Sequence, residues 1–282
     1  MFLVLAAAAC LHAQVKVAVS DVLGKNFATA IETNAHVAGS ELNVSLLGSR
    51  TSLVRLQNGE IDLAVVIPGL GDKLPSGDFV SMVVAYQTAV VVAQETLPIS
   101  QMTFEQLDLI FCETSPSTIR RWGDLGIPGM WNPRPIIPMM TGPLAGLSYD
   151  LFKNTVMSSM SVKVGVSIYD SVDATVARLN SGEDGGLAVL PLPPKNRRLK
   201  ALLLMKQGQN IAQAPTPENV HSGAYPIRMP VYMVFKKSEA QRLFGLTRYF
   251  LGEEGAQTWE SANMMPLPLQ VRNQGIFELE DL

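Results

Sequence analysis

The sequence predicts an α/β protein, and three observations lead to that class. The chain has 282 residues, which is enough for about two domains or lobes of ordinary size. Apolar residues make up 47% and charged residues 17%, so a packed core is expected and disorder is excluded as the dominant state. Segments with strand periodicity alternate with segments with helix periodicity, which is the order of a parallel sheet covered by helices on both faces.

The first segment, Met1–Ala13, is typical of a secretory signal peptide. Its apolar run Phe2–Cys10 is too short to span a bilayer, which takes about 20 residues, and small residues lie near the end of the segment. We expect cleavage after Ala13, which leaves Gln14 as the mature N-terminus; the alternative is a buried first strand. Cys10 follows three alanines, a loose lipoprotein context, so a second alternative is a lipid anchor at Cys10.

The first part of the mature chain follows a β-α-β-α-β order. Alternating or continuous apolar residues indicate strands, and apolar residues at a spacing of three to four indicate helices. The elements predicted in order are a strand over Val15–Val19, a helix over Val22–Ala35, a strand over Leu42–Leu47, a helix over Thr51–Gln57 and a strand over Ile61–Ile67.

The remainder of the chain carries further signals of both kinds. A capping box at Thr103 and Gln106 predicts a helix to Phe111, and a second at Ser238 and Gln241 predicts a helix to Leu251, with Gly252 at its end. Strands are predicted at 83–93, 186–191 and 230–235, and helices at 145–157, at 172–180 after Ser171 and at 255–262. We expect a loop around a short strand at 123–138 and a surface loop at 207–223.

Charge and motifs exclude several functional classes. The net charge is -3, whereas a nucleic-acid binder needs a basic face. The chain has two cysteines and three histidines, and neither a zinc-ligand spacing, a nucleophile elbow nor a phosphate-binding P-loop motif occurs. After cleavage Cys112 is the one cysteine left, and we interpret it as a small core residue. We therefore expect no metal, no cofactor and no enzymatic activity.

Three polar turns follow predicted strands and precede predicted helices. They are Ser20-Asp21, Gly48-Ser49-Arg50-Thr51, and Thr141-Gly142 continuing to Ser148. The N-terminus of a helix offers free backbone N–H groups and the positive end of the helix dipole, and ligands of open α/β sheets bind at the carboxyl ends of strands. Each hydroxyl can cap its helix or donate to an anion, and both interpretations stay open here.

Several motifs resemble the phosphate-binding subunit of bacterial ABC transporters, a family of type II periplasmic binding proteins. The matching segments are TFEQLDLIF at 103–111 with RRWGDLG at 120–126, YPIRMPVYMVF at 225–235 and FLGEEGAQTWESANMMPLP at 250–268. The opening turns, followed by GEIDLA at 59–64, fit the same pattern. The motifs occur in the family's order over nearly the whole mature chain.

The ligand site departs from the family pattern. Before the second-lobe helix the family commonly has Arg-x-x-Ser-Gly-Thr; aligning Phe152 with the family's Phe puts Ser148 at the Thr position and leaves no Arg upstream in the expected place. The stretch after the third strand, 65–69, carries no charge where many members have an Asp. Arg50 could supply a replacement charge or point to solvent, and Asp21 could accept a proton from the ligand or cap a helix.

The resemblance implies a secreted, two-lobed α/β protein of the type II periplasmic-binding-protein fold. It implies lobe 1 from residues 15–88 and 229–282, lobe 2 from 89–228, and a ligand in the cleft between the lobes. The ligand would be phosphate or a related small oxyanion, delivered to an ABC permease by a protein that we expect to be a monomer. The candidate ligand-binding residues are Ser20, Asp21, Gly48, Ser49, Arg50, Thr51, Thr141, Gly142 and Ser148. The alternative is an envelope binding or sensing module that has lost phosphate binding.

Overall fold

The computed structural model describes residues 13–36, 40–69, 71–114, 119–181 and 185–282. The predicted signal peptide and Cys10 lie outside the described residues, except for Ala13, with which the first strand begins. The chain forms two compact units. The first contains residues up to 82 with 232–255 and 273–282, and the second contains residues 83–231 with 256–272. No helix of the described part is long and apolar enough to cross a membrane.

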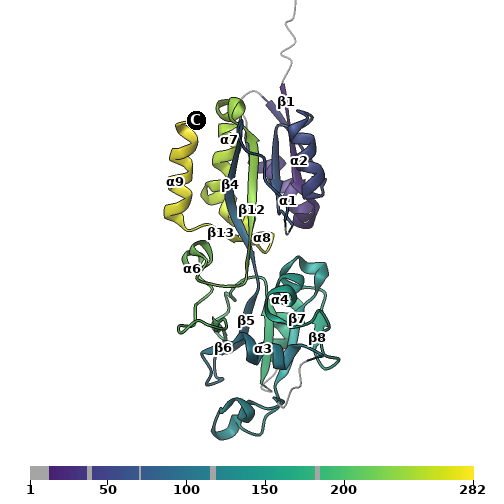
Figure 1. The fold of residues 1–282 in the computed structure, drawn as a ribbon, viewed down its shortest axis with the longest axis vertical. Helices are drawn as coiled ribbons and strands as arrows, with labels where there is room; N and C mark the ends of the chain where they lie inside the picture. The colour runs from purple at the N-terminus through teal and green to yellow at the C-terminus, as the bar shows by residue number, and fades with distance from the viewer. Residues whose placement is uncertain (1–12, 37–39, 70, 115–118, 182–184) are drawn as a thin grey trace, which may run out of the picture. The chain divides into compact units, whose positions relative to one another are not determined.

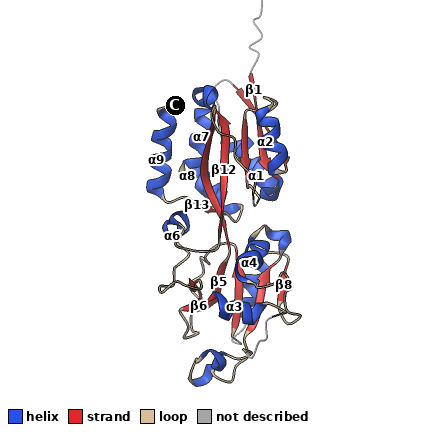
Figure 2. Cartoon of the chain, viewed as in Figure 1, coloured by secondary structure: helices blue, strands red, loops and turns tan. Residues whose placement is uncertain are grey.

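The first unit is built around the predicted β-α-β-α-β segment (Figures 1 and 2). Its elements begin with β1 (Ala13–Ser20), the 3-10 helix η1 (Asp21–Leu23), α1 (Gly24–Asn34), β2 (Ser40–Leu47), α2 (Ser49–Gln57) and β3 (Leu63–Val66). Strand β1 pairs in parallel with both β2 and β3, which confirms the predicted order. Strands β1 and β3 each lie between two other strands of the sheet, and the apolar residues at 15, 17–19 and 63–66 are accordingly wholly buried.

The six-stranded sheet that contains these strands has the order β13-β4-β12-β3-β1-β2. Its other members are β4 (Phe79–Thr88), β12 (Arg228–Lys236) and β13 (Met265–Pro266), and β12 pairs antiparallel with β3. The C-terminal part of the chain adds the 3-10 helix η5 (Lys237–Glu239), α7 (Ala240–Leu251), α8 (Glu253–Ser261) and α9 (Leu269–Glu280). Strands β4 and β12 each contain residues of both units.

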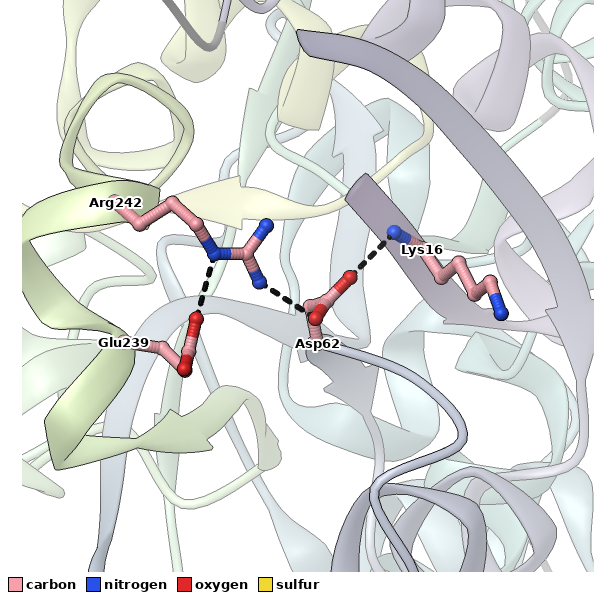
Figure 3. A network of polar contacts seen from close by, with 4 residues as sticks. All are labelled: Lys16, Asp62, Glu239 and Arg242. Atoms are coloured by element: carbon pink, nitrogen blue, oxygen red, sulfur yellow. Dashed lines mark hydrogen bonds and ion pairs between the residues drawn. The ribbon is translucent and has the colours of Figure 1, made fainter. Parts of the chain in front are cut away.

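An ionic network in the first unit joins the start of β3 to α7 (Figure 3). Asp62 accepts the backbone N–H of Lys16 at 2.7 Å and pairs with the Arg242 guanidinium at 2.5 Å. The same guanidinium pairs with Glu239 through Nε at 2.6 Å. Because Arg242 is half-buried and pairs with two carboxylates, the network fixes the register of α7 against β1 and β3 more firmly than an exposed ion pair would.

The second unit contains a five-stranded sheet of order β10-β5-β9-β7-β8. Its strands are β5 (Val90–Gln94), β7 (Ile137–Thr141), β8 (Ser167–Tyr169), β9 (Gly186–Leu190) and β10 (Leu199–Ala201), and β6 (Gln101–Thr103) pairs separately with β11 (Leu203–Met205). Strand β7 runs parallel to β8 and β9, whereas β5 runs antiparallel to β9 and β10. The helices are α3 (Phe104–Phe111), α4 (Ser148–Val156), α5 (Val172–Ser181) and α6 (Pro217–Ser222), with 3-10 helices η2 (Trp122–Leu125), η3 (Gly129–Trp131) and η4 (Pro143–Ala145).

Of the two predicted capping boxes, one forms and the other does not. Thr103 Oγ1 accepts the N–H of Gln106 at 3.1 Å, and Gln106 Oε1 accepts the N–H of Thr103 at 2.9 Å, so the first capping box is confirmed. The second is wrong. A 3-10 turn precedes α7, its N-cap is Glu239, and no side chain caps it. The Glu239 carboxylate pairs with Arg242 instead.

Other predictions need correction. The single strand expected over 83–93 is two strands, β4 and β5, which separate at Ala89. There the Ala89 carbonyl accepts the Tyr225 hydroxyl at 2.8 Å, and the Thr88 hydroxyl donates to Pro191 O at 2.5 Å. The loop expected over 207–223 contains α6, which Thr216 caps through the N–H of Asn219, with Pro217 at the first helical position.

Candidate functional site

The first unit brings together two of the predicted polar turns. Ser20 ends β1, and Ser49 begins α2 just after β2. The Ser49 hydroxyl donates to Ser20 Oγ at 3.3 Å and accepts the N–H of Ile67 at 3.0 Å, so the carboxyl ends of β1, β2 and β3 meet there. Ser20 is 2% exposed, and its own hydroxyl hydrogen has no acceptor among the described residues. A buried donor of this kind is costly to leave unpaired, and a ligand oxygen would pair it.

The charged residues of the same turns lie at the surface. Asp21, Arg50 and Thr51 are exposed, and Gly48 is exposed at the N-cap of α2. No ion pair joins Arg50 to another described residue. Asp21 lies in the first turn of η1, where Ser20 and not Asp21 is the N-cap. An exposed guanidinium on a long side chain is free to turn toward a ligand or to stay in solvent.

The third predicted turn lies in the second unit, between β7 and α4. Thr141 is 1% exposed and its hydroxyl bonds to that of Thr175 at 3.0 Å. The N–H of Gly142 donates to Tyr169 O at 2.7 Å. Gly142 also lies so close to β8 that an added Cβ would be 2.8 Å from the Ile168 side chain. Thr141 therefore joins β7 to α5 through its hydroxyl, and Gly142 joins the end of β7 to β8 through its N–H and its lack of a side chain.

Ser148 differs from the rest of this turn because its hydroxyl is buried and unpaired. It is the first residue of α4, 1% exposed, and its Oγ has no hydrogen-bond partner. Leu147 is the N-cap and no side chain caps the helix. The first-turn N–H groups of α4 have no partner inside the helix, and the helix dipole makes this end positive. A hydroxyl and free N–H groups at one helix end form a donor set suited to an oxyanion.

Gln87 adds an acceptor that the sequence analysis did not identify. It is 1% exposed, its Nε2 donates to Thr88 O at 3.0 Å, and its Oε1 has no partner. This Oε1 lies 3.8 Å from the place of a Cβ on Gly146, two residues before Ser148. The signal available in the sequence was a Gln-Thr pair inside an otherwise apolar run, VVAYQTAVVVA at 83–93. The second unit thus holds an unpaired donor and an unpaired acceptor near the start of α4.

In the described part of the chain, no cluster of three or more His, Cys, Asp or Glu side chains is placed to hold a metal ion. The polar groups of the site are hydroxyls, backbone N–H groups and one amide. Groups of this kind are suited to binding and orienting an anion, and the described ones do not include a nucleophile hydrogen-bonded to an activating base.

Comparisons with known proteins agree with the motifs. Over 208 residues, 68% of this chain and 64% of the relative, the sequence is 26% identical to the phosphate-binding protein PstS of Pseudomonas aeruginosa. The chain thus spans under two-thirds of the length of that relative. The predicted resemblance to the phosphate-binding proteins is confirmed. No family model matches the chain.

Solved structures show the same fold. A "possible phosphate binding protein" of Planctomyces limnophilus aligns with a TM-score of 0.68 and 19% identity, covering 95% of this chain and 98% of its own. PstS of Borrelia burgdorferi gives 0.63 and 15%, covering 91% and 99%. An ABC-type phosphate transport receptor of Vibrio cholerae gives 0.57 and 15%, covering 90% and 100%. The chain has the two-lobed α/β fold of these periplasmic binding proteins, as predicted.

Proposed function

We propose that this chain binds phosphate, or a closely related small oxyanion, as the solute-binding component of an ABC importer. The observation that carries the proposal is the unpaired Ser148 hydroxyl at the start of α4, buried in the same unit as the unpaired Gln87 Oε1. The names of the relatives, which are phosphate-binding proteins, support the same ligand. The predicted lobe boundaries and the position of the ligand in a cleft remain predictions.

The pairing of one donor with one acceptor suits a protonated oxyanion. Ser148 and the α4 N–H groups donate to the unprotonated oxygens of the ligand, and the P–OH of hydrogenphosphate donates to Gln87 Oε1. The orientation of the amide is fixed because Nε2 already donates to Thr88 O. Sulfate has no proton at neutral pH, so its oxygen would face the Gln87 oxygen, acceptor against acceptor. The site should therefore prefer phosphate over sulfate.

The remaining predicted residues have two roles in this proposal. Ser20, Ser49 and the turn from Gly48 to Thr51 supply donors from the first unit, and Arg50 supplies charge. Thr141 and Gly142 hold β7 and β8 in position for the α4 turn. Asp21 is exposed, and the prediction that it caps the helix is wrong because Ser20 is the N-cap of η1; its role as a proton acceptor for the ligand is part of the proposal.

Titration calorimetry of the mature chain tests the binding proposal. We expect phosphate to bind and sulfate to bind at least tenfold more weakly, and Ser148→Ala to weaken phosphate by ~10-fold or more, because a hydrogen bond to a charged group contributes about 1.5–3 kcal/mol. Ser52→Ala is the matched control, since Ser52 is also buried but its hydroxyl already donates to Gly48 O at 3.2 Å. Absence of phosphate binding, or equal affinities for wild type and Ser148→Ala, would contradict the proposal.

The importer role has an alternative, which is an envelope binding or sensing module of the same fold. The observation that favours it is that the buried donors Ser20 and Ser148 are uncharged hydroxyls, whereas Arg50, the charged residue of the predicted turns, is exposed. Phosphate uptake by cells with and without the gene separates the two. Binding in calorimetry without any change in uptake would favour the module.

Export to the periplasm is part of the same proposal, and it rests on the segment Met1–Ala13 and on the class of the relatives. Mass spectrometry of the mature protein gives its first residue: Gln14 supports signal cleavage, and a lipid-modified Cys10 supports the anchor. A monomer is proposed, and its molar mass in solution by light scattering checks that.

A further inference from the structure

A cavity with charged side chains in its wall lies in the second unit, at the end of β7 that is opposite Thr141. It has a volume of about 650 Å³. Its walls come from the end of β5, the start of β10, the end of α5 and the segment around η3 that leads into β7. Thr141 is the last residue of β7 and the cavity residue Arg134 precedes its first, so this cavity is distinct from the α4 turn.

The cavity walls carry an excess of positive charge. Arg134, Arg197 and Arg198 line it together with Glu95, so the described lining residues carry a net charge of +2. Arg197 and Arg198 are exposed, and neither forms an ion pair with a described residue. These two consecutive arginines present positive charge that an anionic ligand can neutralise.

An aromatic ring and an unpaired acceptor add specificity to this charge. The Arg134 guanidinium stacks over the Trp131 ring, with its central carbon 4.5 Å from the ring centroid. Stacking on one face of the guanidinium leaves the N–H groups at its edge free to point toward a ligand. Met130 in the wall is 67% exposed and offers an apolar surface. Asn180 Oδ1, also in the wall, is buried without a hydrogen-bond partner, so a donor on a ligand would pair it.

We propose that this cavity binds a small organic dianion that also carries a hydroxyl or amino donor. The arginines bind two anionic groups, Asn180 accepts from the donor, and Met130 contacts the carbon skeleton. The volume is within the range of small-molecule sites, about 300–1,000 Å³. Phosphate monoesters and hydroxylated dicarboxylates share this chemistry, and inorganic phosphate lacks the carbon skeleton.

Calorimetric titration of the full chain with adenosine 5′-monophosphate, glycerol 3-phosphate and malate tests the proposal. We expect at least one of the three to bind, with an affinity that falls as NaCl rises. The double variant Arg197→Ala/Arg198→Ala should weaken that binding by ~10-fold or more. Preference for the two monoesters or for malate identifies which anionic group the site takes.

The matched control is Lys25→Ala/Lys237→Ala, which removes the same charge from exposed positions that do not line the cavity. It should change the affinity less than about twofold. Ser148→Ala should also leave it unchanged, and Arg197→Ala/Arg198→Ala should leave inorganic phosphate binding unchanged, so this proposal and the proposed function can fail separately. Failure of all three probes to bind, or equal loss in the two double variants, overturns the cavity site.

Discussion

Replacing Ser148 by Ala should make the ligand-free protein more stable, because the structure leaves its hydroxyl buried and unpaired. An unsatisfied buried hydroxyl costs about 1–3 kcal/mol in the folded state. Removing the oxygen leaves a void of about 15 Å³, which at ~24 cal/mol per Å³ costs about 0.4 kcal/mol. The expected net gain in the free energy of unfolding is therefore about 0.6–2.6 kcal/mol. Urea unfolding followed by circular dichroism in phosphate-free buffer measures it.

Phosphate should stabilise the wild type more than it stabilises Ser148→Ala. At a phosphate concentration 100 times the wild-type dissociation constant, binding stabilises the wild type by about 2.7 kcal/mol. If the variant binds tenfold more weakly, the same phosphate stabilises it by about 1.4 kcal/mol. Ser52→Ala, which removes a paired hydroxyl, should instead destabilise by about 0.5–1.5 kcal/mol and leave the phosphate increment unchanged. The reasoning is refuted if Ser148→Ala is destabilising, or if its phosphate increment equals that of the wild type.

Three further predictions test local features. Thr103→Ala should cost about 1 kcal/mol of unfolding free energy because Thr103 caps α3, whereas Ser238→Ala should be neutral, and urea unfolding compares them. Gly185→Ala should destabilise more than Gly208→Ala by thermal melting: both have φ near +85°, but an added Cβ meets an indole nitrogen at 2.4 Å only at Gly185. Burial raises the pKa of the Cys112 thiol, but hydrogen bonds from neighbouring hydroxyls prevail and lower it to about 6. Thiolate absorbance should therefore appear near pH 6. Ionised Cys112 should contribute its full stability above its unfolded pKa, about 8.5, and that contribution should fall as the pH falls toward 6. In a Cys112→Ala variant the free energy of unfolding should lack this dependence on pH.

Elements with a strong local signal could be predicted from the sequence, because the signal and the structure depend on the same contacts. The apolar alternation of β1 corresponds to its buried side chains, and the box at Thr103 to two hydrogen bonds. The same box pattern at Ser238 was wrong, since Glu239 pairs with Arg242 and the chain enters α7 through a 3-10 turn. A capping motif specifies which bonds are available, and tertiary partners decide which ones form.

Helix α9 was not predicted, and its side chains explain why. Arg272 is 8% exposed although charged, and Phe277 is 63% exposed although apolar. The buried face of this helix thus includes a charged residue while an apolar one faces solvent, which weakens the apolar periodicity. The short strands β6, β8, β10, β11 and β13 have two or three residues each, which is too short for an alternation to be recognised.

The sequence predicted where the polar residues of the candidate site lie, but not which of them have groups left to bind a ligand. Strand-to-helix turns identify where polar groups collect, and the structure shows which of those groups the fold already uses. Thr141 is bonded to Thr175, and Gly142 to Tyr169. Ser148 is not bonded. Gln87 was not predicted because its sequence context is that of a buried strand. The structure shows that its Nε2 is hydrogen-bonded and that its Oε1 is not.

The donors of the two units differ in whether they are hydrogen-bonded without ligand. Substitutions in the two units should therefore affect stability and affinity differently. In the first unit the N–H of Ile67 donates to Ser49, Ser49 donates to Ser20, and the Ser20 hydrogen is left over. Each bond of such a chain polarises the next, so Ser20 becomes a stronger donor while Ser49 remains fully bonded without ligand. In the second unit Ser148 stands alone, so its bond can form only with a ligand. Loss of Ser49 therefore removes structure and affinity together, whereas loss of Ser148 removes affinity and relieves a cost.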